Sequence, residues 1–154
     1  MKSFSKEVRP SELRPPAWDV ALVLRSLKGP PYEPLGTVEE CFLAQKTLFL
    51  LALASAKRIG ELQGISYRVS HTRGWGQISC AFVPEFVAKT QDPSVPDSRY
   101  EGFSIPSLGV SGARDRDRRL LCPVRAVRYY LDRTSVHRPH LRRLFLFVTR
   151  LVLK

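Results

Sequence analysis

The sequence predicts a mixed α/β fold, mainly helical, with a small three-stranded antiparallel sheet. An almost uninterrupted apolar run at residues 48–54 is typical of a helix covered on every side. Apolar and polar residues then alternate on both sides of a glycine-bearing turn at residues 74–76, which indicates a hairpin. A second apolar face recurs at helical spacing after Pro123. The length of 154 residues fits one domain with its own core.

The N-terminal part is predicted to contain an arm, a helix and a loop. Residues 1–16 carry prolines among charges and are expected to form an extended arm or linker end, ahead of a single domain at residues 17–154. Apolar residues recur at helical spacing over residues 16–27, with proline at the opening turn, which predicts the first helix. The proline-rich stretch 29–34 is expected to be a loop.

A long central helix and a shorter one are predicted next. The form of a capping box at residues 37–40 marks the start of a helix that continues to about Ala54. Ser55 is expected to cap a second helix at residues 56–63, which Gly64 would end in a left-handed conformation. This break places the cations that follow it in the first turns of a helix, where backbone N–H groups also attract phosphate.

Three strands are expected after the helices. Residues 65–69 and 78–82 alternate apolar and polar side chains, which predicts the two arms of the hairpin. Residues 103–106 are a plausible third strand. At the C-terminus, residues 144–153 form an apolar, β-prone run that is expected to be exposed.

A charged loop and a further helix are predicted between the sheet and the C-terminal run. Residues 109–119 are polar and alternate arginine with aspartate, which is typical of an exposed loop. A helix is expected to begin at Pro123, with Arg125 and Arg128 pointing away from its apolar face and Tyr129 engaged in packing. The apolar face consists of Val124, Val127, Tyr130 and Leu131.

The charge of the chain is strongly positive and locally concentrated. The net charge is +11, and residues 114–143 contain ten arginines against three aspartates, a local charge of +7. Such a balance indicates a polyanionic partner, with nucleic acid favoured over a membrane surface or an acidic protein.

The cysteines and the N-terminus indicate an intracellular protein. Cys41, Cys80 and Cys122 are odd in number and widely spaced, so they match neither a zinc site nor a disulfide framework and fit a reducing compartment. Cys41 and Cys80 are expected to be small core residues. The first residues lack the apolar core of a secretory signal, and the run 48–54 is too short to span a bilayer, so no membrane association is expected.

A compact polar cluster follows the apolar run. Lys57, Arg58 and Glu61 lie within one helical turn, and Arg58 and Glu61 are spaced so that the carboxylate can orient the guanidinium. The planar fork of arginine forms paired hydrogen bonds with phosphate and keeps its proton. The cluster is therefore a candidate anion site, and the alternative is an ordinary surface ion pair.

Residues 54–62 resemble the first catalytic box of tyrosine recombinases, the phage-integrase-like enzymes, in which an arginine precedes Glu-Leu by two residues. The preceding apolar helix, the hairpin that leads to Lys89 and the segment 121–131 resemble the same family in the same order, most closely the recombinases of DIRS-type retroelements. The resemblance covers roughly residues 18–148 but only the first half of a family catalytic domain.

This resemblance implies DNA strand exchange through a 3′-phosphotyrosine, without a metal or other cofactor. Arg58 would stabilise the charge of the transition state, Lys89 would protonate the leaving 5′ oxygen, and Glu61 would orient Arg58. A solvated lysine at a strand end is the alternative for Lys89, and a solvated loop is the alternative for the arginines of residues 114–119. The residues expected to contact duplex DNA are Lys57, Arg58, Arg116, Arg118 and Arg119.

The sequence departs from the family in its later motifs. It contains no tyrosine after Tyr130, and its His-x-x-Arg string at residues 140–143 precedes the apolar run that resembles the strand before the family box, which indicates a decoy. We therefore expect a truncated, catalytically incomplete fragment that binds DNA. Its expected location is nuclear, and its expected protein partners are a second copy or a complementing recombinase half.

The composition is also compatible with two other functions, and the incomplete fold affects the expected stability. The main alternative is a small basic interaction or scaffold domain derived from a retroelement, which would bind a protein through residues 144–153. A phosphate-binding metabolic enzyme is disfavoured because no glycine-rich phosphate loop is present, and no small-molecule substrate is expected. Marginal stability is expected because the missing half would normally cover the helix at residues 38–54.

Overall fold

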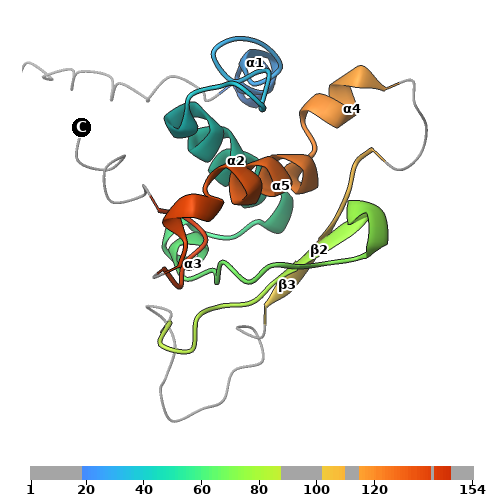
Figure 1. Cartoon of the computed structure of the whole chain (residues 1–154). Coiled ribbons are helices and arrows are strands. Elements are labelled where there is room, and N and C mark those ends of the chain that lie inside the picture. Colours follow the sequence, from blue (N-terminus) through green and yellow to red (C-terminus); the bar gives the residue numbers. More distant parts are fainter. Residues whose placement is uncertain (1–18, 88–101, 110–114, 140, 147–154) are drawn as a thin grey trace, which may run out of the picture.

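The structure is a computed structural model and describes residues 19–87, 102–109, 115–139 and 141–146. The described residues form a mixed α/β fold with a three-stranded antiparallel sheet, as predicted. Figure 1 shows α2 and α5 at the centre, the sheet below them, and α1 and α4 above. The elements in chain order are α1 (Val20–Ser26), α2 (Glu40–Ser55), α3 (Ile59–Gln63), β1 (Ser70–His71), the 3₁₀ turn η1 (Arg73–Trp75), β2 (Gln77–Cys80), β3 (Phe103–Pro106), α4 (Arg116–Leu120), α5 (Pro123–Arg133) and the 3₁₀ turn η3 (Ser135–His137).

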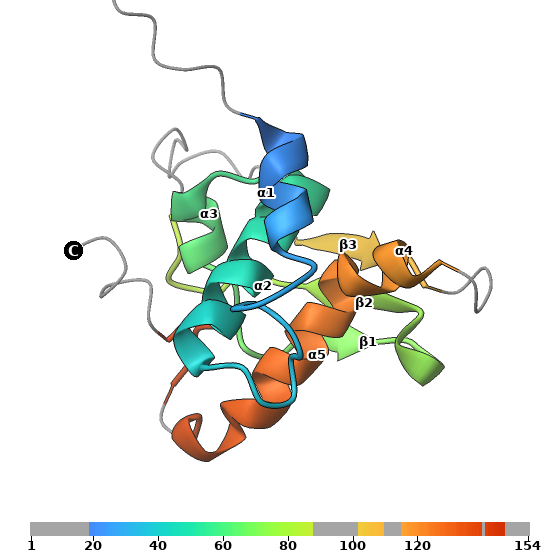
Figure 2. The ribbon, with the colours of Figure 1, turned by 90° about the horizontal axis from the view of Figure 1, so that it is seen from above.

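The core lies between the two central helices and the sheet. α2 and α5 pack against each other, and both also contact β3 (Figures 1 and 2). Alternate residues of the strands turn toward the helices, so that Ile78, Cys80 and Ile105 are buried. The fully buried side chains of α2 and α5 include Leu43, Leu51, Val124, Val127 and Tyr130.

The central helix α2 differs from its prediction at both ends. It begins at Glu40, with Glu39 as its N-cap and no side-chain capping bond, so the predicted capping box at residues 37–40 is not formed. At the other end Leu53 is 52% exposed, so the helix is not covered on every side. Leu50 and Leu51 are buried, whereas Phe42 and Phe49 are half-buried, so α2 is fully covered on one side only.

The connection between α2 and α3 is made by a left-handed alanine. Ala56 has φ 53° and ends α2, an uncommon conformation for a residue with a side chain. Ser55 is the last residue of α2, and its hydroxyl donates to the Leu51 carbonyl, so it does not cap α3 as predicted. Gly64 has φ −82° and is not left-handed. A glycine is needed there because a Cβ would collide with the ring of Phe86.

The remaining elements agree in part with the sequence. β3 has its predicted bounds, and the turn before β2 contains the expected glycine at φ 77°, followed by Trp75 at φ 61°. The predicted strand at residues 65–69 is reduced to isolated bridges at Ile65 and Ser66, and the ladder instead begins at β1. The first helix is confirmed over α1, where the Asp19 carboxylate accepts from the Leu22 N–H at 3.1 Å. Residues 29–34 form no helix or strand, as predicted.

The C-terminal part contains two corrections. The predicted loop at residues 109–119 includes a short helix, α4, which begins after Asp115 because that carboxylate accepts from the Arg118 N–H at 3.2 Å. α5 begins at Pro123 as predicted. The apolar run is not exposed at its start, since Leu144 and Phe145 are buried. The predicted arm at residues 1–16 and residues 147–153 lie outside the described part of the chain.

Candidate nucleic-acid interface

The first candidate site is the start of α3, which presents Arg58. One oxygen of Glu61 accepts from the backbone N–H of Arg58 at 2.8 Å, and the other lies 3.4 Å from Lys57 Nζ. The Arg58 amide and the Lys57 charge lower the pKa of Glu61. The expected contact between Glu61 and the Arg58 guanidinium is therefore replaced by a contact with the Arg58 backbone. Glu61 therefore fixes the backbone at Arg58. The Arg58 side chain is exposed and forms no ion pair within the described residues.

Lys57 is more constrained than Arg58. Its side chain is half-buried between Glu61 and the ring of Phe82, with Nζ 5.9 Å from the ring centroid. These contacts hold the ammonium against the protein by ion-pair and cation–π attraction. The charge of Arg58 is therefore more accessible to a ligand than the charge of Lys57.

The second candidate site is a cleft of about 800 Å³ between the loop after α1 and helix α4. It brings together the three predicted arginines of α4 with Lys28 and Arg125, which the sequence did not indicate. Arg118 pairs with Asp115 at 2.9 Å, and Lys28 pairs with Asp117 at 2.7 Å. Arg116 and Arg119 are exposed, and they form no ion pair within the described residues, unlike the other cations of this cleft.

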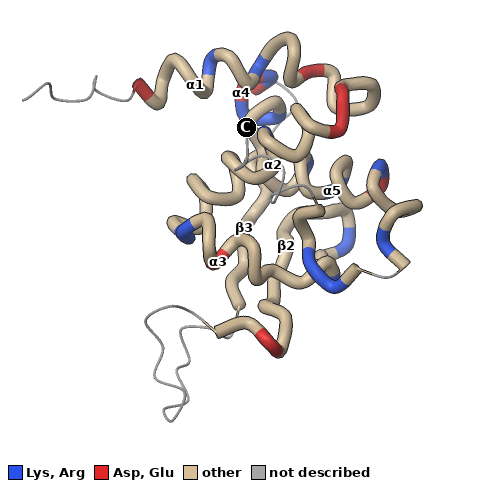
Figure 3. The backbone as a smooth tube through the Cα atoms, turned by 90° about the vertical axis from the view of Figure 1, so that its left-hand side faces the viewer, with Lys and Arg blue, Asp and Glu red and all other residues tan. Residues whose placement is uncertain are grey.

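The two candidate sites lie apart. Figures 1 and 2 place α3 and α4 on different sides of the central helices. The positions of lysine and arginine are correspondingly spread over several segments of the backbone (Figure 3). The structure therefore joins Arg58 with Lys57, and Arg116 with Arg118 and Arg119, but it does not bring the two groups into one pocket.

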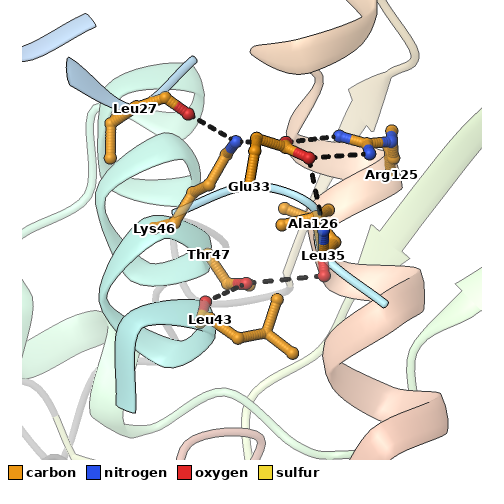
Figure 4. A network of polar contacts seen from close by, with 8 residues as sticks. All are labelled: Leu27, Glu33, Leu35, Leu43, Lys46, Thr47, Arg125 and Ala126. Atoms are coloured by element: carbon orange, nitrogen blue, oxygen red, sulfur yellow. Dashed lines mark hydrogen bonds and ion pairs between the residues drawn. The ribbon is translucent and has the colours of Figure 1, made fainter. Parts of the chain in front are cut away.

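An ion cluster on one wall of the cleft, which includes Glu33 and Arg125, was not predicted from the sequence. Figure 4 shows the carboxylate of Glu33 between Lys46 of α2 and Arg125 of α5. Glu33 lies 2.5 Å from Lys46 Nζ and 2.7 Å from the nearer guanidinium nitrogen of Arg125, and it also accepts from the Leu35 N–H at 3.2 Å. Lys46 in addition donates to the Leu27 carbonyl at 2.7 Å. The cluster fixes the proline-rich loop to both central helices.

The pKa values in this cluster follow from burial and pairing. Burial lowers the pKa of Lys46, whose side chain is 0% exposed, and the nearby Glu33 only partly offsets this. Burial alone would raise the pKa of Glu33, but hydrogen bonds from Arg125 and Lys46 outweigh it and lower that pKa. Arg125, which was predicted only to point away from the apolar face of α5, pairs with Glu33 and so stabilises the fold. A lysine in the middle of the predicted central helix was the available signal.

A second buried cation has only neutral partners. Arg138 is 7% exposed and donates to the Thr134 hydroxyl and, at 3.1 Å, to the Leu144 carbonyl. Its guanidinium also lies over the ring of Tyr130, with its central carbon 5.3 Å from the centroid. One nitrogen, Nη1, is buried without a hydrogen-bond partner among the described residues, and burial lowers the pKa of the group. Arg138 therefore holds the C-terminal segment without a carboxylate.

Lys89, the cysteines and a possible metal site were also addressed by the sequence predictions. Lys89, the predicted acid, lies outside the described residues. Cys80 is buried, which raises the pKa of its thiol to about 12, and this agrees with its predicted place in the core, whereas Cys41 is only half-buried. The described part of the chain contains no group of three or more His, Cys, Asp or Glu residues suited to a metal ion.

Comparison with other proteins adds no assignment to these sites. No protein-family model, curated protein or solved structure matches the chain. Among the helices of the described residues, none has the length and apolar character needed to cross a membrane.

Proposed function

We propose that the chain is a duplex-DNA-binding fragment of a tyrosine-recombinase-type enzyme, of the kind that acts in DNA recombination and integration. The observation that carries this proposal is the setting of Arg58. The left-handed Ala56 turns the chain out of the central helix, and Glu61 fixes the backbone N–H of Arg58 at 2.8 Å. The backbone is thus ordered while the guanidinium remains exposed, an arrangement suited to paired hydrogen bonds with a DNA phosphate.

The proposed fragment binds DNA without cleaving it. A covalent step needs a tyrosine nucleophile, and Tyr130 is unsuited to that role because it is buried and its hydroxyl accepts from the Leu146 N–H at 3.1 Å. Burial also raises its pKa, which disfavours the phenolate. In a complete active site, an arginine placed like Arg58 would contribute roughly 3–4 kcal/mol of transition-state stabilisation. Here its proposed role is phosphate binding, and the proposed location of the protein is nuclear.

The proposal is tested by a mobility-shift titration of a short DNA duplex. The variant Arg58→Ala is compared with Arg73→Ala, which removes the same charge from an exposed position in η1 and outside both α3 and α4. Without the phosphate hydrogen bonds of its guanidinium, Arg58→Ala is expected to bind about tenfold more weakly. Equal affinities of the two variants, or no binding by the folded wild type, would remove the support for Arg58.

The arginines of α4 supply the second proposed contact. Arg116 and Arg119 are exposed and have no carboxylate partner in the described residues, whereas Arg118 is already paired with Asp115. We therefore expect Arg116 and Arg119 to contribute more to phosphate binding than Arg118. Because they lie apart from Arg58, the duplex would have to bridge the two sites, or a second copy or complementing recombinase half would have to hold one of them.

A further inference from the structure

An apolar hollow of about 370 Å³ opens beside the basic cleft. It is lined by apolar residues of α1, the end of α2, β3 and the start of α5, and none of its lining residues is charged. Two leucines that line the hollow are strongly exposed to solvent, Leu53 at 52% and Leu108 at 46%. By contrast, Leu50 on the same helix is buried. An exposed apolar hollow of this kind is a common feature of binding sites.

The hollow remains open because α1 covers the core incompletely. No residue of α1 is buried, although Leu24 reaches the hollow and Leu27, just after the helix, is 3% exposed. α1 thus closes one side of the hollow and leaves Leu53 on the other side accessible. The available apolar surface is a consequence of how the short first helix lies against the end of α2.

The hollow and the basic cleft form one continuous surface. Leu108 belongs to the walls of both, and the adjacent residues Leu120 and Leu121 line the cleft and the hollow respectively. Arg116 and Arg119 stand on the cleft side without an ion pair in the described residues. One half of the surface is therefore apolar and the other half carries two available positive charges.

We infer that this joined surface binds a short acidic segment of another protein. Apolar side chains of the segment enter the hollow beside Leu53 and Leu108, and its carboxylates pair with Arg116 and Arg119. The match of an apolar stripe with charges at one end is the recognition mode of an amphipathic helix in a groove. A second copy is disfavoured because each chain carries a charge of +11, and duplex DNA presents phosphates but no aliphatic side chains to fill the hollow.

The probe for this inference is a short fluorescent peptide with leucines at helical spacing and glutamates at one end. Binding is measured by anisotropy on the full chain, with a peptide of the same composition but scrambled order as the reference. Leu53→Glu is expected to weaken binding by at least about tenfold, because it places a carboxylate in the hollow. Val136→Glu, at a position that is 82% exposed on η3, adds the same charge elsewhere and is expected to leave binding unchanged.

The cationic half is tested with the double variant Arg116→Ala and Arg119→Ala. Its peptide affinity is expected to fall by about tenfold, against little change for Arg68→Ala with Arg73→Ala, which removes equal charge from other exposed positions. Circular dichroism on each variant separates loss of binding from loss of fold. Equal binding of the ordered and scrambled peptides, or an unchanged affinity of a folded Leu53→Glu variant, would overturn the inference.

Duplex DNA is the competing occupant of the basic half. If the arginine variant loses DNA affinity while Leu53→Glu has no effect on either ligand, the cleft is a phosphate site alone and the inference fails. If Leu53→Glu loses the peptide but keeps its DNA affinity, the apolar hollow serves the peptide and not DNA, and the inference stands. The result for the peptide is thus independent of the fate of the proposed DNA-binding function.

Discussion

The cluster around Glu33 and the helix α4 are both rich in cations, but the cations have different roles in the two places. In the first, one carboxylate holds the fully buried Lys46 and the half-buried Arg125. In the second, Arg116 and Arg119 are exposed and lack a carboxylate partner in the described residues. The net charge of +11 is therefore larger than the charge available to a partner, because some of the cations stabilise the fold.

The largest expected effect comes from breaking the Glu33 cluster. Glu33→Gln leaves two cations without their carboxylate, one of them fully buried, and is expected to reduce the free energy of unfolding by about 3–5 kcal/mol. Urea denaturation followed by circular dichroism measures this change. The control is Glu39→Gln, since Glu39 is exposed and its side chain makes no capping bond. Similar midpoints for the two variants would show that the cluster is not structurally important.

The same cluster predicts a loss of stability in acid. The pKa of Glu33 is lower in the folded protein than in the unfolded chain, where it is about 4.3. Its stabilising contribution is therefore fully present above about pH 4.3 and is lost as the pH falls through the folded pKa. Glu61, whose pKa is also lowered, acts in the same direction. Urea midpoints measured between neutral and acidic pH should fall less steeply for Glu33→Gln than for wild type, and parallel curves would contradict this assignment.

A smaller effect is expected at the buried cation that has only neutral partners. Arg138→Met removes a buried charge but keeps much of the packing against Tyr130, at the cost of the hydrogen bonds to the Thr134 hydroxyl and the Leu144 carbonyl. These effects oppose each other, so the free energy of unfolding is expected to stay within about 1 kcal/mol of wild type. Thermal melts of the two proteins check this. A destabilisation as large as that of Glu33→Gln would contradict the account, because Arg138 would then be as important for stability as the cations that are paired with a carboxylate.

The local patterns of the sequence were sufficient for several elements. The short segment 103–106 after a turn-rich stretch predicted β3 at its observed bounds, and the proline at the first helical position predicted the start of α5. The same local rules failed at Gly64, where the contact with Phe86, not a left-handed conformation, requires glycine. They also failed at Ala56, because a left-handed alanine carries no sequence signal.

The candidate sites were only partly predictable, for a related reason. Arg58 and its neighbouring acid were visible because they lie within one turn, although the acid binds the backbone of Arg58 and not its guanidinium. Glu33 and Arg125 are 92 positions apart, and their pairing depends on how the loop meets α5. The hollow beside Leu53 likewise depends on the incomplete cover that α1 gives to α2. Such sites arise from packing between distant segments and leave no short motif.

The most direct test of the proposed function is the salt dependence of duplex DNA binding. The logarithm of the association constant is plotted against the logarithm of salt concentration for wild type, Arg58→Ala and the double variant at Arg116 and Arg119. Removing one arginine from a DNA phosphate should reduce the magnitude of the slope by about 0.9, which gives about one unit for the first variant and about two for the second. Binding that does not respond to salt, or slopes that stay equal in all three proteins, would contradict the proposal.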